Sequence, residues 1–150
     1  MNGHAIRLAG QAGFGIAPAL HSIPGINLAV TAFPGGQLTE SSYIAAYESW
    51  QTVAPVLKHG ERLHTHFAMQ ACGPTPLAPA LWWVFQQMQF LPEKRKLVLI
   101  LTDGEPDNKD ETGAAIETGT RLGFEIYGIG VASGSLAQLL PDTHAQTIQN

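Results

Sequence analysis

Two apolar segments constrain the fold of this chain more than any other feature. "KLVLILT" (96–102) is continuously apolar, which is typical of a parallel strand covered on both faces. "FEIYGIGV" (124–131) is a second such segment, and Gly123 before it is placed to end a helix. A helical pattern over 111–122 lies between the two strands. Strand, helix and strand in this order predict a βαβ unit with parallel strands.

The rest of the chain continues the alternation of strands and helices. From 76 to 91 the apolar residues share one helical stripe, with Thr75 expected as the N-cap and Pro76 at the first helical position. Further elements are expected as a strand at "INLAVTAF" (26–33), helices over 4–22 and 40–56, an edge strand at 62–69, a helical turn near 134–140 and a last strand at "HAQTIQ" (144–149). The pattern predicts a single α/β domain over 1–150, with a mainly parallel sheet flanked by helices on both faces.

Composition excludes several classes of protein. Hydrophobic residues make up 45% of the 150 residues and charged residues only 13%, which indicates a well-buried core. A formal charge of -4 without a Lys/Arg cluster argues against nucleic acid and anionic membranes as partners. No apolar stretch approaches the ~20 residues that span a bilayer. The single cysteine, Cys72, is compatible with the cytoplasm, where we expect the protein to be.

The segment "LILTDGEPDN" (99–108) places three carboxylates directly after the most hydrophobic strand. In open α/β sheets the functional site lies outside the carboxyl ends of the strands, where Asp103 is expected. Thr75, on a loop at the same edge, would bring a hydroxyl near it. Hard cations such as Mg²⁺ take carboxylate and hydroxyl oxygens, so the pair predicts a metal site. The alternatives remain open that Thr75 is only a helix cap and that Asp103-Gly104 is only a turn.

These segments carry a resemblance to a known family. "GPTPLAPAL" (73–81), "KLVLILTDGEPDN" (96–108) and "GFEIYGIGV" (123–131) together resemble a von Willebrand factor A (vWA) domain, and "GINLAVTAFPGG" (25–36) resembles its second strand. The bacterial subgroup with cobaltochelatase-type and nitric-oxide-reductase-accessory proteins is the most similar. The resemblance implies a Rossmann-like sheet with a metal-ion-dependent adhesion site for Mg²⁺ or Mn²⁺. In the family that site joins an Asp-x-Ser-x-Ser loop, a Thr and an Asp.

The last two positions of the family's site map onto Thr75 and Asp103, but the first is missing. Asp-x-Ser-x-Ser occurs nowhere in the 150 residues. We therefore expect an N-terminally truncated vWA fold, in which Met1 would directly follow that loop and the first strand is lost. The loss would leave a sheet edge open, and an open edge favours self-association into a homo-oligomer. Without the loop, metal binding is expected to be weak at best or absent.

Three functions follow as hypotheses. The first is a non-enzymatic binding module, whose cation grips an acidic group of a protein partner; the resemblance implies a MoxR-like AAA+ ATPase, in metal insertion or complex assembly. In this hypothesis Thr75 and Asp103 hold the metal, while Glu105, Asp107 and Trp82 face the partner. The second is a Mg²⁺-dependent phosphoryl-transfer enzyme that uses Asp103. The third is a metal-free remnant that only self-associates.

Overall fold

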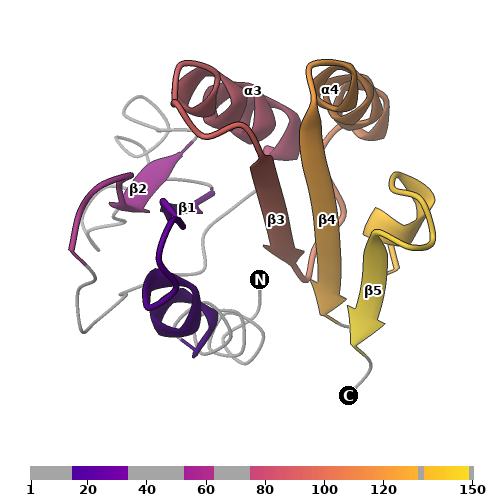
Figure 1. The fold of residues 1–150 in the computed structure, drawn as a ribbon. Helices are drawn as coiled ribbons and strands as arrows, with labels where there is room; N and C mark the ends of the chain where they lie inside the picture. Colours follow the sequence, from indigo (N-terminus) through magenta and orange to yellow (C-terminus); the bar gives the residue numbers. More distant parts are fainter. Residues whose placement is uncertain (1–14, 34–52, 63–74, 132–133, 149–150) are drawn as a thin grey trace, which may run out of the picture. The chain divides into compact units, whose positions relative to one another are not determined.

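The structure, a computed structural model, describes residues 15–33, 53–62, 75–131 and 134–148. The chain divides into two compact units, Met1–Gly73 and Pro74–Asn150, each described below by itself (Figure 1). That the two form a single domain stays a prediction. In order, the labelled elements are β1 (Val30–Ala32), β2 (Ala54–Leu57), α3 (Leu77–Met88), β3 (Lys96–Thr102), α4 (Lys109–Arg121), β4 (Phe124–Val131), η1 (Leu136–Gln138) and β5 (Ala145–Ile148).

The first unit holds a helical segment at 15–21 and a short antiparallel pair, β1 with β2. Val30 lies opposite Leu57, which is completely buried. Gly25 has a φ of 88°, a conformation that glycine adopts without steric cost, and it lies in a turn. The predicted helix over 4–22 is confirmed for 15–21, and its earlier part lies outside the described residues.

Two predictions for the first unit need correction. Of the strand expected at 26–33, only Val30–Ala32 is paired. The helix expected over 40–56 is wrong at its end, because β2 begins at Ala54. Pro55 has no N–H to continue a helix, whereas a two-stranded pair tolerates proline at an edge. The remainder of that predicted helix, and the strand expected at 62–69 beyond Arg62, lie outside the described residues.

The second unit is built on a parallel sheet in the order β3-β4-β5. The register runs from Lys96 opposite Phe124 to Thr102 opposite Gly130, and the three arrows lie side by side in Figure 1. The strands predicted at 96–102 and 124–131 are confirmed with their bounds. The predicted final strand is confirmed as β5 and the predicted helical turn as η1. This unit is therefore α/β with a parallel sheet, as a Rossmann-like fold requires.

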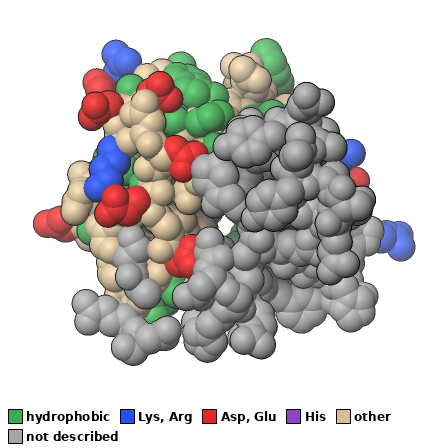
Figure 2. All heavy atoms as spheres, turned by 180° about the vertical axis from the view of Figure 1, so that it is seen from behind, with side chains coloured by type: hydrophobic (Ala, Val, Ile, Leu, Met, Phe, Trp, Pro, Cys, Tyr) green, Lys and Arg blue, Asp and Glu red, His purple; other side chains and the backbone are tan. Residues whose placement is uncertain are grey.

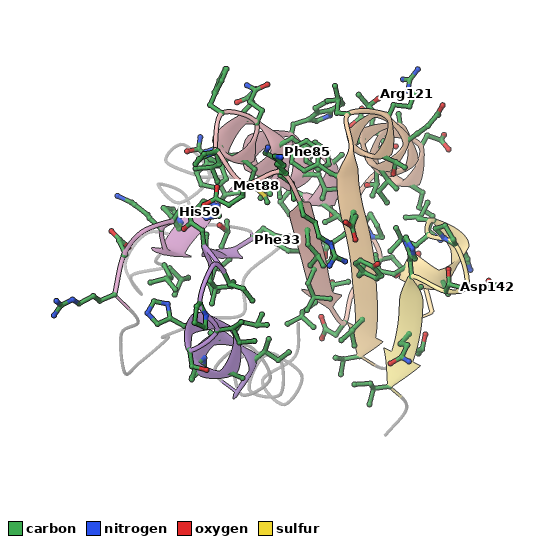
Figure 3. All side chains as sticks on the ribbon, viewed as in Figure 1. Phe33, His59, Phe85, Met88, Arg121 and Asp142 are labelled. Carbon is green, nitrogen blue, oxygen red and sulfur yellow. The ribbon has the colours of Figure 1, made fainter. Side chains whose placement is uncertain are left out.

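One face of this sheet carries the core of the second unit. Val98 and Ile100 on β3 are buried, as is Ile126 on β4. Phe85 lies on α3 (Figure 3), and the centroid of its ring is 4.7 Å from that of Phe124. Helix α4 packs on β4. The helices α3 and α4 thus bury the same face.

The C-terminal turn η1 covers the remainder of this face. A Cβ at Gly128 of β4 would lie 2.8 Å from a methyl of Leu140 and 2.9 Å from one of Leu136. Both leucines are buried, so the absence of a side chain at Gly128 lets the turn lie close to the sheet.

The opposite face of β3 is more open. Leu97 is 46% exposed and Leu99 is 38% exposed. In the described part of this unit the helices pack on the other face. That helices cover both faces of the sheet therefore stays a prediction.

Among the described residues, no helix combines the length and the apolar character needed to cross a membrane.

Both ends of α4 carry residues that favour helix ends. Asn108 caps α4 by accepting a hydrogen bond from the Glu111 N–H at 3.1 Å, and Gly123 follows the helix with a φ of 89°. The helix predicted over 111–122 is confirmed, starting two residues earlier at Lys109.

The prediction that Thr75 caps α3 is wrong. Pro76 occupies the N-cap position, with φ -77° and ψ 63°, and makes no side-chain cap hydrogen bond. The Thr75 carbonyl accepts from the Leu77 N–H at 2.8 Å, which closes an inverse γ-turn around the proline. Thr75 therefore precedes the helix, and its backbone is used in the contacts described next.

Candidate functional site at the carboxyl edge of the sheet

Thr75 and Asp107 exchange two hydrogen bonds. The Thr75 N–H donates to Oδ1 of Asp107 at 2.6 Å, and the Asp107 N–H donates to the Thr75 carbonyl at 3.1 Å. These bonds join the chain before α3 to the loop that leaves the carboxyl end of β3. The expectation that these two loops meet is confirmed.

The two loops also approach each other closely at Gly104. A Cβ at Gly104 would lie 2.8 Å from Oγ1 of Thr75, a separation that real Cβ atoms do not reach. The Thr75 hydroxyl therefore lies directly against the backbone next to Asp103, which is partly buried. The structure thus brings the Thr75 side chain to the loop that carries Asp103.

Two buried hydroxyls that the sequence analysis did not identify hold the same glycine. Oγ1 of Thr102 accepts from the Gly104 N–H at 3.2 Å. The hydroxyl of Ser135 donates to the Gly104 carbonyl at 3.2 Å, and the Thr102 hydroxyl lies 3.5 Å from that same oxygen. Each hydroxyl-bearing residue is only 3% exposed. The signal that could have found Ser135 is its place after β4, at the same sheet edge.

Glu105, Asp107 and Trp82, the further predicted site residues, each contact another described residue. Asp107 is bonded to Thr75, while Glu105 is ion-paired with Lys109 at 3.2 Å. Trp82 is 40% exposed on α3 and sets its ring edge-on to Phe85, 6.0 Å between centroids. This contact packs Trp82 against a buried residue of the same helix.

The oxygen atoms at this edge suit a hard cation only in part. Thr75 offers a hydroxyl and Asp103 a carboxylate, and Mg²⁺ is commonly held by one or two carboxylates with water in the other positions. In 15–33, 53–62, 75–131 and 134–148, no three His, Cys, Asp or Glu side chains gather as a metal-binding group. Thr75 and Asp103 would therefore suit an ion that is weakly bound and keeps most of its water ligands.

Charges elsewhere on the second unit form a separate pair. Arg95 and Glu125 make two hydrogen bonds, at 2.6 and 2.7 Å, near the amino ends of β3 and β4. The hydrogen bond from Arg95 lowers the pKa of Glu125, and the same bond raises the pKa of Arg95; their charge attraction adds to both shifts. On the face shown in Figure 2, acidic side chains of described residues occur at several separate places.

Comparisons of this chain with protein-family models, with curated proteins and with solved structures find no match. The residues and contacts at the carboxyl edge of the sheet are therefore the features from which a function can be inferred.

Proposed function

We propose that this chain is a non-enzymatic protein-binding module of the vWA type, which holds Mg²⁺ or Mn²⁺ weakly through Thr75 and Asp103. One observation carries the proposal: the Thr75 hydroxyl lies against Gly104, beside Asp103, at the carboxyl edge of a parallel sheet. The motifs "GPTPL" and "LTDGEP", on which the resemblance depends, are the two segments that meet there.

In this proposal the chain supplies only part of the coordination shell. Asp103 contributes charge and Thr75 a neutral oxygen, and a carboxylate of the partner takes a remaining position of the cation. Glu105 and Asp107 make the surroundings negative, so an acidic partner would be repelled without the cation. Binding is therefore cation-dependent. By resemblance, the partner is a MoxR-like AAA+ ATPase in metal insertion or complex assembly, with Trp82 as a further contact.

A cation titration tests the proposal. Binding to the native state must stabilise it, by about 2.7 kcal/mol at a free cation concentration of one hundred times Kd. We expect millimolar Mn²⁺ or Mg²⁺ to raise the melting temperature of the wild type but not of Asp103→Ala. Asp142→Ala is the control, because Asp142 is an exposed acidic residue of the turn before β5. An unchanged melting temperature of the wild type at millimolar cation would sink the proposal.

A metal-free module that only self-associates is the second candidate. It is favoured by β3, the end strand of the described sheet, on which Leu97 and Leu99 are exposed. Exposed apolar end strands pair readily with further strands. Sedimentation velocity should then show oligomers that persist with EDTA, and Leu97→Lys with Leu99→Lys should give monomers. Leu122→Lys, at a leucine that is 65% exposed after α4, should leave the oligomers intact.

A further inference from the structure

We propose that Ser135 is a positioning residue of this site, which acts with Thr102 to fix the two peptide groups that flank Gly104 and thereby the backbone that carries Asp103. As far as it concerns metal affinity, the inference depends on the function proposed above. The restriction of the Gly104 backbone by the two hydroxyls does not depend on that function.

The geometry of the two hydroxyls is complementary. Thr102 accepts the Gly104 N–H at 3.2 Å, a local turn in which a side chain bonds the backbone two residues on. Ser135 donates to the Gly104 carbonyl at 3.2 Å from a loop that lies 31 residues away in the sequence. Both polar groups of this glycine are therefore bound by buried side chains, as buried polar groups require.

Gly104 needs such support from outside. It has no side chain to restrict its backbone, and none can be added because Thr75 occupies the space. A flexible glycine next to Asp103 would let the carboxylate adopt many positions relative to the Thr75 hydroxyl. The hydrogen bonds of Thr102 and Ser135 restrict this freedom, which is why we assign them a positioning role.

Ser135 also extends the site to a third loop. Thr102, at the end of β3, lies opposite Gly130 of β4, so the segment after β4 emerges at the same sheet edge. Residues that orient a metal ligand without touching the metal typically change metal affinity by about 10- to 100-fold. Removal of the Ser135 hydroxyl should thus weaken cation binding although Ser135 is not proposed as a ligand.

The first measurement needs no metal. Amide hydrogen exchange at Gly104 in the full chain should be about fivefold to tenfold faster in Thr102→Val, the change expected when this N–H loses its acceptor. Ser135→Ala releases the Gly104 carbonyl and should also make exchange at Gly104 faster, because the backbone there becomes less restricted. Thr102→Ser keeps the hydroxyl and should exchange as the wild type does. Thr112→Val is the control, since Thr112 is a fully buried threonine whose hydroxyl donates to the Asn108 carbonyl at 2.7 Å. Wild-type exchange in Ser135→Ala would overturn the inference.

The second measurement is Mn²⁺ affinity by calorimetric titration. Ser135→Ala should bind Mn²⁺ about tenfold more weakly than the wild type, and Thr112→Val should bind it equally well. Equal affinity in Ser135→Ala and the wild type overturns the positioning role, even if exchange at Gly104 is faster. If the wild type binds no Mn²⁺, the proposed function fails, and the exchange experiment alone decides whether Ser135 fixes the loop.

Discussion

The ring of Phe85 occupies the space that a side chain at Gly119 would need. A Cβ built on Gly119 would lie 2.8 Å from Cε2 of Phe85 and 3.0 Å from Cε1. The ring cannot easily move away, because Phe85 is 3% exposed and lies between Trp82 and Phe124. Helices α3 and α4 therefore approach closely at one glycine, and this contact holds the helical layer of the second unit together.

Gly119→Ala should consequently destabilise the protein. Overpacking of a core typically costs about 1–3 kcal/mol, and the better helix propensity of alanine offsets up to about 1 kcal/mol of that. We expect a net loss of about 1–2 kcal/mol in the free energy of urea unfolding. Gly113→Ala on the same helix is the control, since its Cβ would meet Leu139 at an ordinary 3.9 Å. Equal stability of the two variants would contradict the close contact at Phe85.

The strands of the second unit could be predicted from the sequence, whereas β2 of the first unit could not. β3 and β4 are long and largely buried on the core face, so their apolar runs mark both ends. β2 is short and contains Pro55, and its pairing with β1 depends on residues far away in the sequence. No local period distinguishes such a segment from a helix.

At the candidate site, motifs predicted which loops meet but not how they are joined. Asp103 directly follows β3, and Thr75 lies just before α3. The N-cap prediction for Thr75 failed because a γ-turn around Pro76 delays the helix to Leu77, while the Thr75 hydroxyl lies against Gly104. Ser135 was missed because its place after β4 indicates only the sheet edge. Its bond to the Gly104 carbonyl, 31 residues away, depends on the fold.

Gly104→Ala should separate the two loops of the site. The added methyl would collide with Oγ1 of Thr75, so we expect a loss of about 1–3 kcal/mol in unfolding free energy. Thr75→Ala removes the colliding oxygen and should relieve much of this cost in the double variant. Gly134→Ala is the control because a Cβ there meets no atom within 4 Å. Strict additivity of Gly104→Ala and Thr75→Ala in a double-mutant cycle would exclude the contact.

Asp107→Ala should weaken the contact between the loop after β3 and the chain before α3. The Thr75 N–H loses a charged acceptor at 2.6 Å, and since Asp107 is exposed, water replaces part of that bond. We expect a loss of about 1 kcal/mol, and a smaller one for Asp107→Asn, which keeps an acceptor oxygen but not the charge. Glu105→Gln removes an exposed ion pair and should change stability by less than about 0.5 kcal/mol. Urea midpoints that rank Glu105→Gln with Asp107→Ala would refute this assignment.

The pair of Arg95 and Glu125 predicts a pH dependence with a definite sign. Hydrogen bonding to Arg95 lowers the pKa of Glu125 in the folded protein, so the folded state holds the charged carboxylate more strongly than the unfolded state does. The resulting stabilisation is present at neutral pH and is lost as the pH falls below the ordinary glutamate value of about 4.3 and through the lowered folded pKa. Glu125→Gln should therefore be less stable than the wild type at pH 7, and the difference in stability should become smaller as the pH falls to 3. Arg95→Gln should lose the same part of the profile, so that adding Glu125→Gln to it changes little. If the gap between wild type and Glu125→Gln is as large at pH 3 as at pH 7, the carboxylate charge is not its cause.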